Sequence, residues 1–248
     1  MLNNIIAPTT IKEFKTKMDN SETFVIKGDK DKFKNLITLD EIEATLNNGC
    51  NWNVPVSVIY DGARQLYIAG DVAWTPQALN KTKVKEMIEA NNSFMMMNQS
   101  QINKQVAELV TSIEDEFDMF GDAHIYVSPS TESTGYKAHR DRPQHKIYLQ
   151  LEGTSNWQIF DHNDLDEEIS YLEEEDENKH LVEKMNFELE AGDLLYMPPN
   201  TFHKVRNYSG ARISLSVPFN KSDYDEMRKM DRTHIPLKDI WNNAATAR

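Results

Sequence analysis

The spacing of apolar residues predicts a mixture of helices and strands in the first 121 residues. Apolar positions recur at helical spacing in some segments and cluster as short extended runs in others. The predicted helices cover residues 11–18, 38–46, 81–90 and 101–120. The predicted strands cover residues 23–27, 56–60 and 65–68. The last two flank Asp61-Gly62, a dipeptide that suits a tight turn, and we therefore expect a hairpin there.

The segment 101–120 has the strongest helical pattern in the chain. Six apolar residues recur in it at intervals of three or four positions. They are Ile102, Val106, Leu109, Val110, Ile113 and Phe117. We expect this stripe to face the hydrophobic core.

After Gly121 the pattern changes to short strand-like runs. They cover residues 123–127, 136–140, 146–151, 157–160, 187–190, 193–197, 202–206 and 212–218. Eight short strands predict a closed or sandwiched β fold, so the fold class is mixed α+β dominated by β. An insertion at 161–185 interrupts the series, and the chain returns to polar, helix-like sequence after residue 220.

Length and composition predict one domain of catalytic size with small appendages. We expect residues 1–121 to pack on a core formed by 122–219, with 220–248 as a short helical C-terminus. Cys50 is the single cysteine, which excludes an intramolecular disulfide and a cysteine-based zinc site. A reducing, cytoplasmic compartment fits best. The start has no signal-peptide pattern and no stretch has about 18 consecutive apolar residues, so we expect no membrane segment.

The net charge of −13 is concentrated in one part of the chain. Residues 161–177 contain ten Asp and Glu residues and no Lys or Arg. A negative surface repels phosphate backbones, so nucleic acid is disfavoured as a partner. The acidic stretch either attracts a basic peptide or is a solvated loop, and the sequence leaves both interpretations open.

His139 and Asp141 are the first candidates for metal ligands. They lie two positions apart in a strand-like run, and a strand directs such residues to the same face. In isolation this pair is more often an ordinary surface feature. A third candidate, His203, follows in the segment FELEAGDLLYMPPNTFHKV, in which a Gly-Asp turn, an apolar strand and a stiff Pro-Pro loop precede the histidine. Two His and one carboxylate form a facial triad that leaves three positions open on Fe(II).

The arrangement of these segments resembles that of cupin proteins, and specifically the JmjC-type, ribosomal-oxygenase-like family. The resemblance covers about residues 122–219, including YKAHRDRPQHKIYLQLEGTSNWQIF. It implies a double-stranded β-helix (cupin or jelly-roll) core and an Fe(II) site formed by His139, Asp141 and His203. It also implies 2-oxoglutarate as cosubstrate and O2 as oxidant. A cupin without metal is the alternative interpretation.

The position of the cation that would bind 2-oxoglutarate departs from the family pattern. Many JmjC proteins have Lys or Arg just after the Gly turn, but residues 153–156 are Gly-Thr-Ser-Asn. Arg212, followed by Ser214, offers a replacement similar to the R-x-S of other 2-oxoglutarate oxygenases. If residues 207–210 form a hairpin with an even loop, both side chains share the face of His203. Lys146 is the next candidate.

Four further polar residues lie in or next to the strand-like runs. The resemblance places Tyr136 and His145 where residues of the cosubstrate pocket usually lie, although either suits a packed barrel interior equally well. His124 and His162 lack a partner at ligand spacing, and we interpret them as structural or surface residues.

The resemblance implies an oxygenase that hydroxylates a C–H bond, most simply on a protein or peptide side chain. The alternatives are a small-molecule hydroxylase, a cupin metalloenzyme that does not use 2-oxoglutarate, and an inactive cupin that binds a partner. The missing cation after the Gly turn favours the second alternative. The segment 222–248 is either a dimerisation appendage, giving a homodimer, or a helix packed on the barrel.

Overall fold

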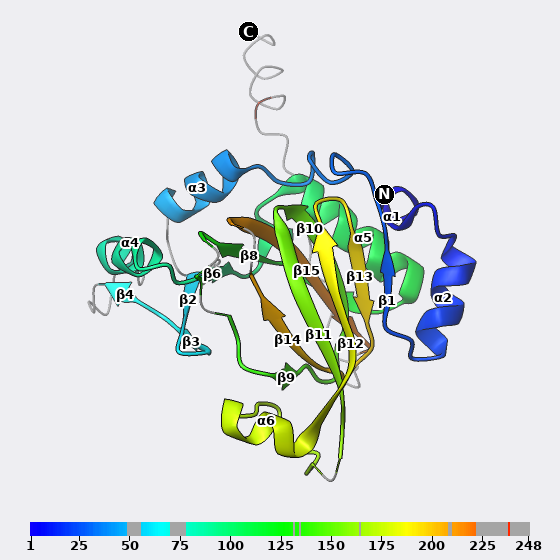
Figure 1. The fold of residues 1–248 in the computed structure, drawn as a ribbon. Coiled ribbons are helices and arrows are strands. Elements are labelled where there is room, and N and C mark those ends of the chain that lie inside the picture. Colours follow the sequence, from blue (N-terminus) through cyan, green and yellow to red (C-terminus); the bar gives the residue numbers. More distant parts are fainter. Residues whose placement is uncertain are drawn as a thin grey trace, which may run out of the picture.

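Two facing β-sheets form the centre of the protein (Figure 1). The structure is a computed structural model, and it describes residues 1–48, 56–69, 78–130, 132–133, 135–163, 165–207, 210–221 and 238. The major sheet contains, in spatial order, β1 (Phe24–Ile26), β13 (Leu194–Met197), β10 (His145–Glu152), β15 (Arg212–Asn220), β8 (His124–Ser128), β6 (Phe94–Met96), β2 (Val56–Tyr60) and β3 (Ala63–Gln65), with β7 (Phe120–Gly121) beside β15.

The minor sheet lies against the major sheet and contains four strands. In spatial order they are β12 (Leu181–Glu190), β11 (Thr154–His162), β14 (Phe202–Arg206) and β9 (His139–Arg140). A separate short pair consists of β4 (Ile68–Ala69) and β5 (Ala78–Leu79). Every described strand pair is antiparallel. The predicted mixed fold with a β-dominated double-stranded β-helix core is confirmed.

The four helices predicted from apolar spacing are present, and their ends differ by a few residues. The helices are α1 (Leu2–Ile6), α2 (Ile11–Asp19), α3 (Leu39–Asn48), α4 (Lys81–Glu89), α5 (Lys104–Phe117) and α6 (Glu174–His180), with a 3-10 turn at Gln99–Gln101. A capping box between Thr10 and Glu13 starts α2. The side chain of Asn103 accepts from Val106 N and starts α5.

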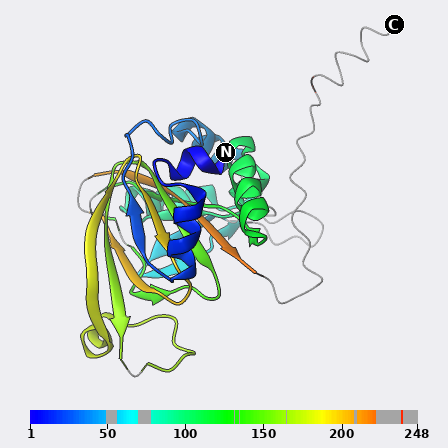
Figure 2. The same ribbon diagram turned by 90° about the vertical axis from the view of Figure 1, so that its right-hand side faces the viewer.

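Helix α5 supplies the predicted core stripe. Val106, Leu109, Val110 and Ile113 are all fully buried in one cluster with apolar residues of the major sheet. The prediction that Ile102 belongs to this stripe is wrong, because Ile102 precedes the helix and is 42% exposed. The helix also ends three residues early, since Asp118 adopts a left-handed conformation (φ 51°) and Phe120 enters β7. Figure 2 shows α5 on the side of the molecule away from β11 and β12.

The predicted strands contain errors in both sheets, and β6 and β7 of the major sheet were not predicted. The strand expected at 136–140 is only two residues long, and residues 181–185, assigned to the insertion, belong to β12. Strand β12 lies at a sheet edge, and its register with β11 shifts at Lys184, so the alternation that is clear in residues 185–190 does not extend through residues 181–184. The insertion therefore spans 163–180. In the first half, the hairpin turns at Asp61-Gly62 as predicted, but its second strand is β3 and not 65–68.

Residues before and after position 121 contribute to the same sheet. Strands β1, β2, β3 and β6 join β8, β10, β13 and β15, so the N-terminal segment extends the major sheet as well as packing on it. The predicted C-terminal helix lies outside the described residues apart from position 238. Among the helices that the structure describes, none combines the length and apolar character needed to cross a bilayer.

Candidate active site

The structure brings His139, Asp141 and His203 together. Their ligand atoms lie within 4.8 Å of one another. The short strand β9 carries His139, Asp141 follows it directly, and β14 carries His203 at the position paired with His139. The two imidazole centroids are 4.2 Å apart, and His203 Nε2 is 3.7 Å from Asp141 Oδ2.

Both histidines present the same ring nitrogen to the centre of this cluster. His139 Nδ1 lies 2.8 Å from the carbonyl oxygen of Lys137, and His203 Nδ1 lies 3.0 Å from that of Thr201. A carbonyl only accepts, so each Nδ1 donates and each Nε2 keeps its lone pair. Backbone carbonyls orient metal-binding histidines in this way in many proteins.

The protonation states also suit a divalent cation. Burial lowers the pKa of His203 to about 3, and burial likewise lowers the pKa of His139. Burial would raise the pKa of Asp141, but Lys146 and the two histidines outweigh it and hold that pKa at about 2. At neutral pH the site therefore offers two neutral imidazoles and one carboxylate, which is the donor set that Fe(II) binds.

Lys146 contacts the carboxylate of this triad. Its Nζ lies 2.5 Å from Asp141 Oδ2, and its side chain is buried. Asp141 Oδ2 thus forms a close ion pair with Lys146 in the metal-free protein. Lys146 thus neutralises Asp141, and it does not line the cavity that contains Arg212.

Arg212 and Ser214 line the same cavity as His139 and His203. Four aromatic residues complete most of its wall, namely Tyr126, Tyr136, Tyr148 and Trp157. The condition set for Arg212, a hairpin at residues 207–210, is not met, because β14 and β15 belong to different sheets. Arg212 reaches the cavity because it lies on the face of β15 that packs towards the minor sheet.

A buried polar chain holds Arg212 in place. Arg212 Nη1 donates to Ser214 Oγ (3.1 Å), and Ser214 Oγ donates to Gln150 Oε1 (2.9 Å). Ser155 Oγ also donates to Gln150 Oε1 (2.8 Å), so the uncharged segment after Gly153 joins the same chain. Within the described residues Arg212 Nε has no partner. Burial lowers the pKa of Arg212 to about 10, and its guanidinium is still charged at neutral pH.

The two residues suggested by the resemblance as pocket-lining lie in different places. Tyr136 lines the cavity, with its ring 5.3 Å from that of His139, and burial raises its pKa to about 12. His145 does not reach the cavity. Alternation along β10 sends its ring to the opposite face, where it stacks on Phe219 and its Nδ1 lies 2.7 Å from Tyr196 Oη. His145 is therefore a packing residue.

Several residues at the site could not be predicted from the sequence. Tyr126 and Gln150 lie in apolar strands without a motif, and Tyr171, which stacks on His139 at 5.4 Å, lies in the acidic stretch. Alternation on β8 indicates only that Tyr126 shares a face with His124. His124 is an interior residue whose pKa burial lowers to about 4, as expected for a structural histidine.

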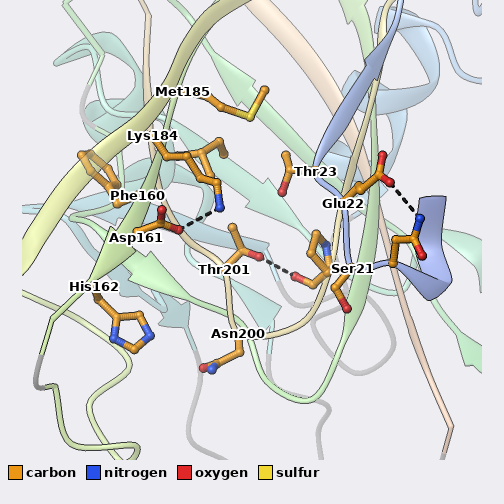
Figure 3. A pocket seen from close by; sticks show the side chains of 13 residues that line it. Ser21, Glu22, Thr23, Phe160, Asp161, His162, Lys184, Met185, Asn200 and Thr201 are labelled. Carbon is orange, nitrogen blue, oxygen red and sulfur yellow. Dashed lines mark hydrogen bonds and ion pairs between the residues drawn. The ribbon is translucent and has the colours of Figure 1, made fainter.

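A larger cavity on another part of the surface does not contain the triad. It has a volume of about 660 Å³ and is lined by polar residues of the segment before β1, of β11 and β12, and of the loop before β14. Figure 3 shows Asp161 and Lys184 paired across it, near His162 and Thr201. His162, predicted to be structural or on the surface, also packs edge-on against Phe202. The two histidines and the carboxylate that could bind a metal lie outside this cavity, so we place the chemistry at the triad.

Comparisons with known proteins agree with this arrangement. The "Bifunctional lysine-specific demethylase and histidyl-hydroxylase NO66" of Dictyostelium discoideum is 26% identical over 212 residues, covering 83% of this chain and 40% of the relative. Ribosomal oxygenase 1 of Danio rerio is 24% identical over 196 residues, covering 77% and 35%. The chain thus spans less than half the length of these relatives.

Solved structures show the same fold. The ribosomal oxygenase YcfD from Escherichia coli, in complex with cobalt and 2-oxoglutarate, superposes with a TM-score of 0.60 at 16% identity, covering 97% of this chain and 66% of that one. The family model described as the JmjC domain matches residues 93–227, which is more than half of the chain and includes the whole triad. This protein therefore belongs to the JmjC domain family.

Proposed function

We propose that this protein is an Fe(II)- and 2-oxoglutarate-dependent dioxygenase that hydroxylates a C–H bond on a protein or peptide side chain. One observation carries the proposal. Two neutral imidazoles and an ionised carboxylate converge within 4.8 Å, beside a cavity that also contains a buried arginine. A metal site needs the first feature, and an anionic cosubstrate needs the second.

The three ligands would hold iron on one side only. His139 and His203 bind through Nε2, and Asp141 binds through a carboxylate oxygen. When bound, Fe(II) would allow O2 to take two electrons from 2-oxoglutarate, which becomes succinate and carbon dioxide, and two from the C–H bond, which becomes a C–OH group. Lys146 keeps Asp141 ionised and fixed in position. The surrounding aromatic residues exclude water from the cavity.

Arg212 is the group that we propose binds the distal carboxylate of 2-oxoglutarate. Its guanidinium is planar and charged, and its Nε has no partner within the described residues. Ser214 would add a hydroxyl beside it. A cation from the major sheet would thereby replace the one that is missing after Gly153.

A protein substrate agrees with the shape of the approach to this cavity. A cleft of about 750 Å³, which we call the vestibule, shares Gly135 with the metal cavity. Its other lining residues are Asp61, Gly62, Ser133, Lys137, Glu173, Glu174, Glu175 and Arg206. The two cations pair with Glu173 and Glu174, which leaves Asp61 and Glu175 without an ion-pair partner among the described residues. A polypeptide segment carrying positive charge would fit this vestibule. The relatives named histidyl-hydroxylase and ribosomal oxygenase support a protein substrate.

Release of carbon dioxide from labelled 2-oxoglutarate with Fe(II), ascorbate and air tests the proposal without a known substrate. We expect turnover in the wild type, loss of turnover in His139→Ala, and loss of 2-oxoglutarate binding in Arg212→Ala. Arg212→Lys should bind weakly, because lysine keeps the charge but lacks the planar fork. His180→Ala, which changes a histidine on α6, is the matched control and should resemble the wild type.

The alternatives give other outcomes in the same assay. Metal binding without 2-oxoglutarate binding would indicate a cupin metalloenzyme that does not use this cosubstrate. Neither metal nor cosubstrate binding would indicate an inactive binding module. Turnover stimulated by small molecules and not by peptides would indicate a small-molecule hydroxylase. A cytoplasmic location and a homodimer stay predictions from the sequence.

A further inference from the structure

The insertion at 163–180 is attached to the metal-binding strand by backbone contacts. Tyr171 forms an isolated antiparallel bridge with His139. On either side, Arg140 N donates to Ser170 O (2.9 Å) and Leu172 N donates to Ala138 O (3.0 Å). Residues 170–172 therefore act as a short additional strand at the open edge of the minor sheet, next to β9.

The register across the minor sheet places Tyr171 in line with both histidine ligands. Ile159 pairs with His203, His203 pairs with His139, and His139 pairs with Tyr171. Residues that oppose one another in antiparallel strands project from the same face. Tyr171 therefore continues the row of ligands, and its ring is nearly parallel to that of His139 (11°) at 5.4 Å.

A buried arginine fixes the segment that carries Tyr171. Arg140 projects from the opposite face of β9 and is 3% exposed. Its Nε donates to Ile169 O (2.8 Å), and its Nη2 donates to Asp166 O (2.7 Å) and Glu167 O (3.0 Å). A buried guanidinium is costly unless its donors are satisfied, so these three bonds hold the loop in one conformation. The position of Tyr171 beside the metal site is thus set before any ligand binds.

The ring of Tyr171 remains accessible despite this fixed position. The residue is 57% exposed, although it touches a metal ligand. Tyr136 borders His139 on another side at 5.3 Å, and Glu173, two residues after Tyr171, lines the vestibule. An exposed aromatic ring that is rigidly held beside a reaction centre offers apolar surface to a ligand without the loss of side-chain freedom on binding.

We infer that Tyr171 is a specificity-determining residue of this enzyme. The target side chain of a polypeptide substrate packs against the exposed part of the Tyr171 ring, which holds the reacting carbon next to the iron ligands. This inference rests on the proposed function. Arg140 acts indirectly, as a positioning residue for the segment that presents Tyr171.

A library of nine-residue peptides, with each of the twenty amino acids fixed in turn at the centre, tests this role. The peptide that gains one oxygen with the wild type is then labelled with fluorescein, and its affinity is measured by anisotropy for the Co(II)-loaded protein under nitrogen. We expect Tyr171→Ala to weaken peptide binding and raise KM about tenfold, with kcat within about threefold of the wild type. Affinity for Co(II) should stay the same, because Tyr171 is not a metal ligand.

Two further variants separate contact from folding. Tyr171→Phe keeps the ring and should restore peptide affinity, whereas Ile169→Ala changes another exposed apolar residue of the insertion and should have no effect. Unchanged peptide affinity in Tyr171→Ala would overturn the inference. An equal loss of Co(II) affinity would also overturn it, since Tyr171 would then only support His139. Turnover of 2-oxoglutarate with no peptide modified would overturn this inference alone, whereas no 2-oxoglutarate binding would overturn the proposed function.

Discussion

The major sheet is buried on both faces, whereas the minor sheet is buried mainly on one. Eight of the nine residues of β15 and six of the eight of β10 are buried, but along β11 buried residues alternate with more exposed ones. Most of β12 is exposed or only partly buried. The major sheet receives α5 and the N-terminal helices on its outer face, whereas the outer face of the minor sheet faces solvent except where the insertion covers β9 and β14.

The residues of the candidate active site are divided between these two sheets. Both histidine ligands lie on the minor sheet, and the groups that set their environment, Lys146 and Arg212, lie on the major sheet. A sheet packed on both faces tolerates buried charge only at fixed positions with partners, so it provides a rigid support. The insertion that contains Tyr171 pairs with β9, which is an edge strand of the minor sheet.

The largest expected effect concerns the major sheet. Leu149 is fully buried within the main core, so Leu149→Ala should lower the free energy of unfolding by about 3 kcal/mol. Val182→Ala, on the exposed edge of the minor sheet, is the control and should change it by less than about 0.5 kcal/mol. Urea unfolding measures both variants. Equal losses would contradict the contrast between the two sheets.

The second effect concerns metal binding to the minor sheet. Co(II) at a hundredfold its Kd should add about 2.7 kcal/mol to the free energy of unfolding, because it binds the folded chain only. His203→Ala should lose most of this gain, whereas Leu149→Ala should keep it despite its lower stability. Urea unfolding with and without Co(II) separates the two contributions. A gain that persists in His203→Ala would place the metal away from the triad.

The pattern of apolar residues predicts the major sheet better than the minor one for a physical reason. Strands such as β13 and β15 are short apolar runs, and α5 has a clear helical stripe, so burial is visible in the sequence. The alternating part of β12 at 185–190 is visible in the sequence, but residues 181–184 lie beyond a register shift and pair with β11 through the backbone, which needs no apolar pattern. The same holds for residues 170–172, whose attachment to β9 depends on backbone bonds and on Arg140.

Residues of the candidate site could be predicted from the sequence where they belong to a recognisable motif. His139, Asp141 and His203 follow a spacing that resembles a known family, and the structure brings all three together. Arg212 also lies where a carboxylate could bind, although the hairpin used to place it does not form. His145 shows the opposite failure, since position relative to the motif does not tell which face of β10 a residue occupies.

The third effect is a dependence of stability on pH that originates in the minor sheet. The pKa of His203 is about 3 in the folded protein and about 6.5 when unfolded. As pH falls below 6.5 the unfolded chain binds a proton that folded His203 does not, so stability present above pH 6.5 is lost. The metal-free protein should lose roughly 2 kcal/mol between pH 7.5 and 5 from this residue. His139, with its lowered pKa, adds to the loss.

Urea titrations of the metal-free protein at several pH values measure this slope. His203→Gln removes the titrating group and should flatten the curve over the same range. A slope that is unchanged in this variant would show that other groups cause the acid sensitivity, and the minor sheet would then lose its special role in it.

The smallest expected effect tests a solvent-exposed part of the minor sheet, at the ends of β11 and β12 near the insertion. Asp161 and Lys184 pair at 2.9 Å between β11 and β12, but their side chains are 64% and 57% exposed (Figure 3). Water and salt screen such a pair, so Asp161→Ala should change the free energy of unfolding by less than about 0.5 kcal/mol, measured by urea unfolding at low and high salt. A loss above about 1 kcal/mol would mean that this exposed part of the minor sheet contributes to stability as well. The division between a stabilising sheet and a functional one would then hold only where the two sheets pack together and the ligands and the core residues meet.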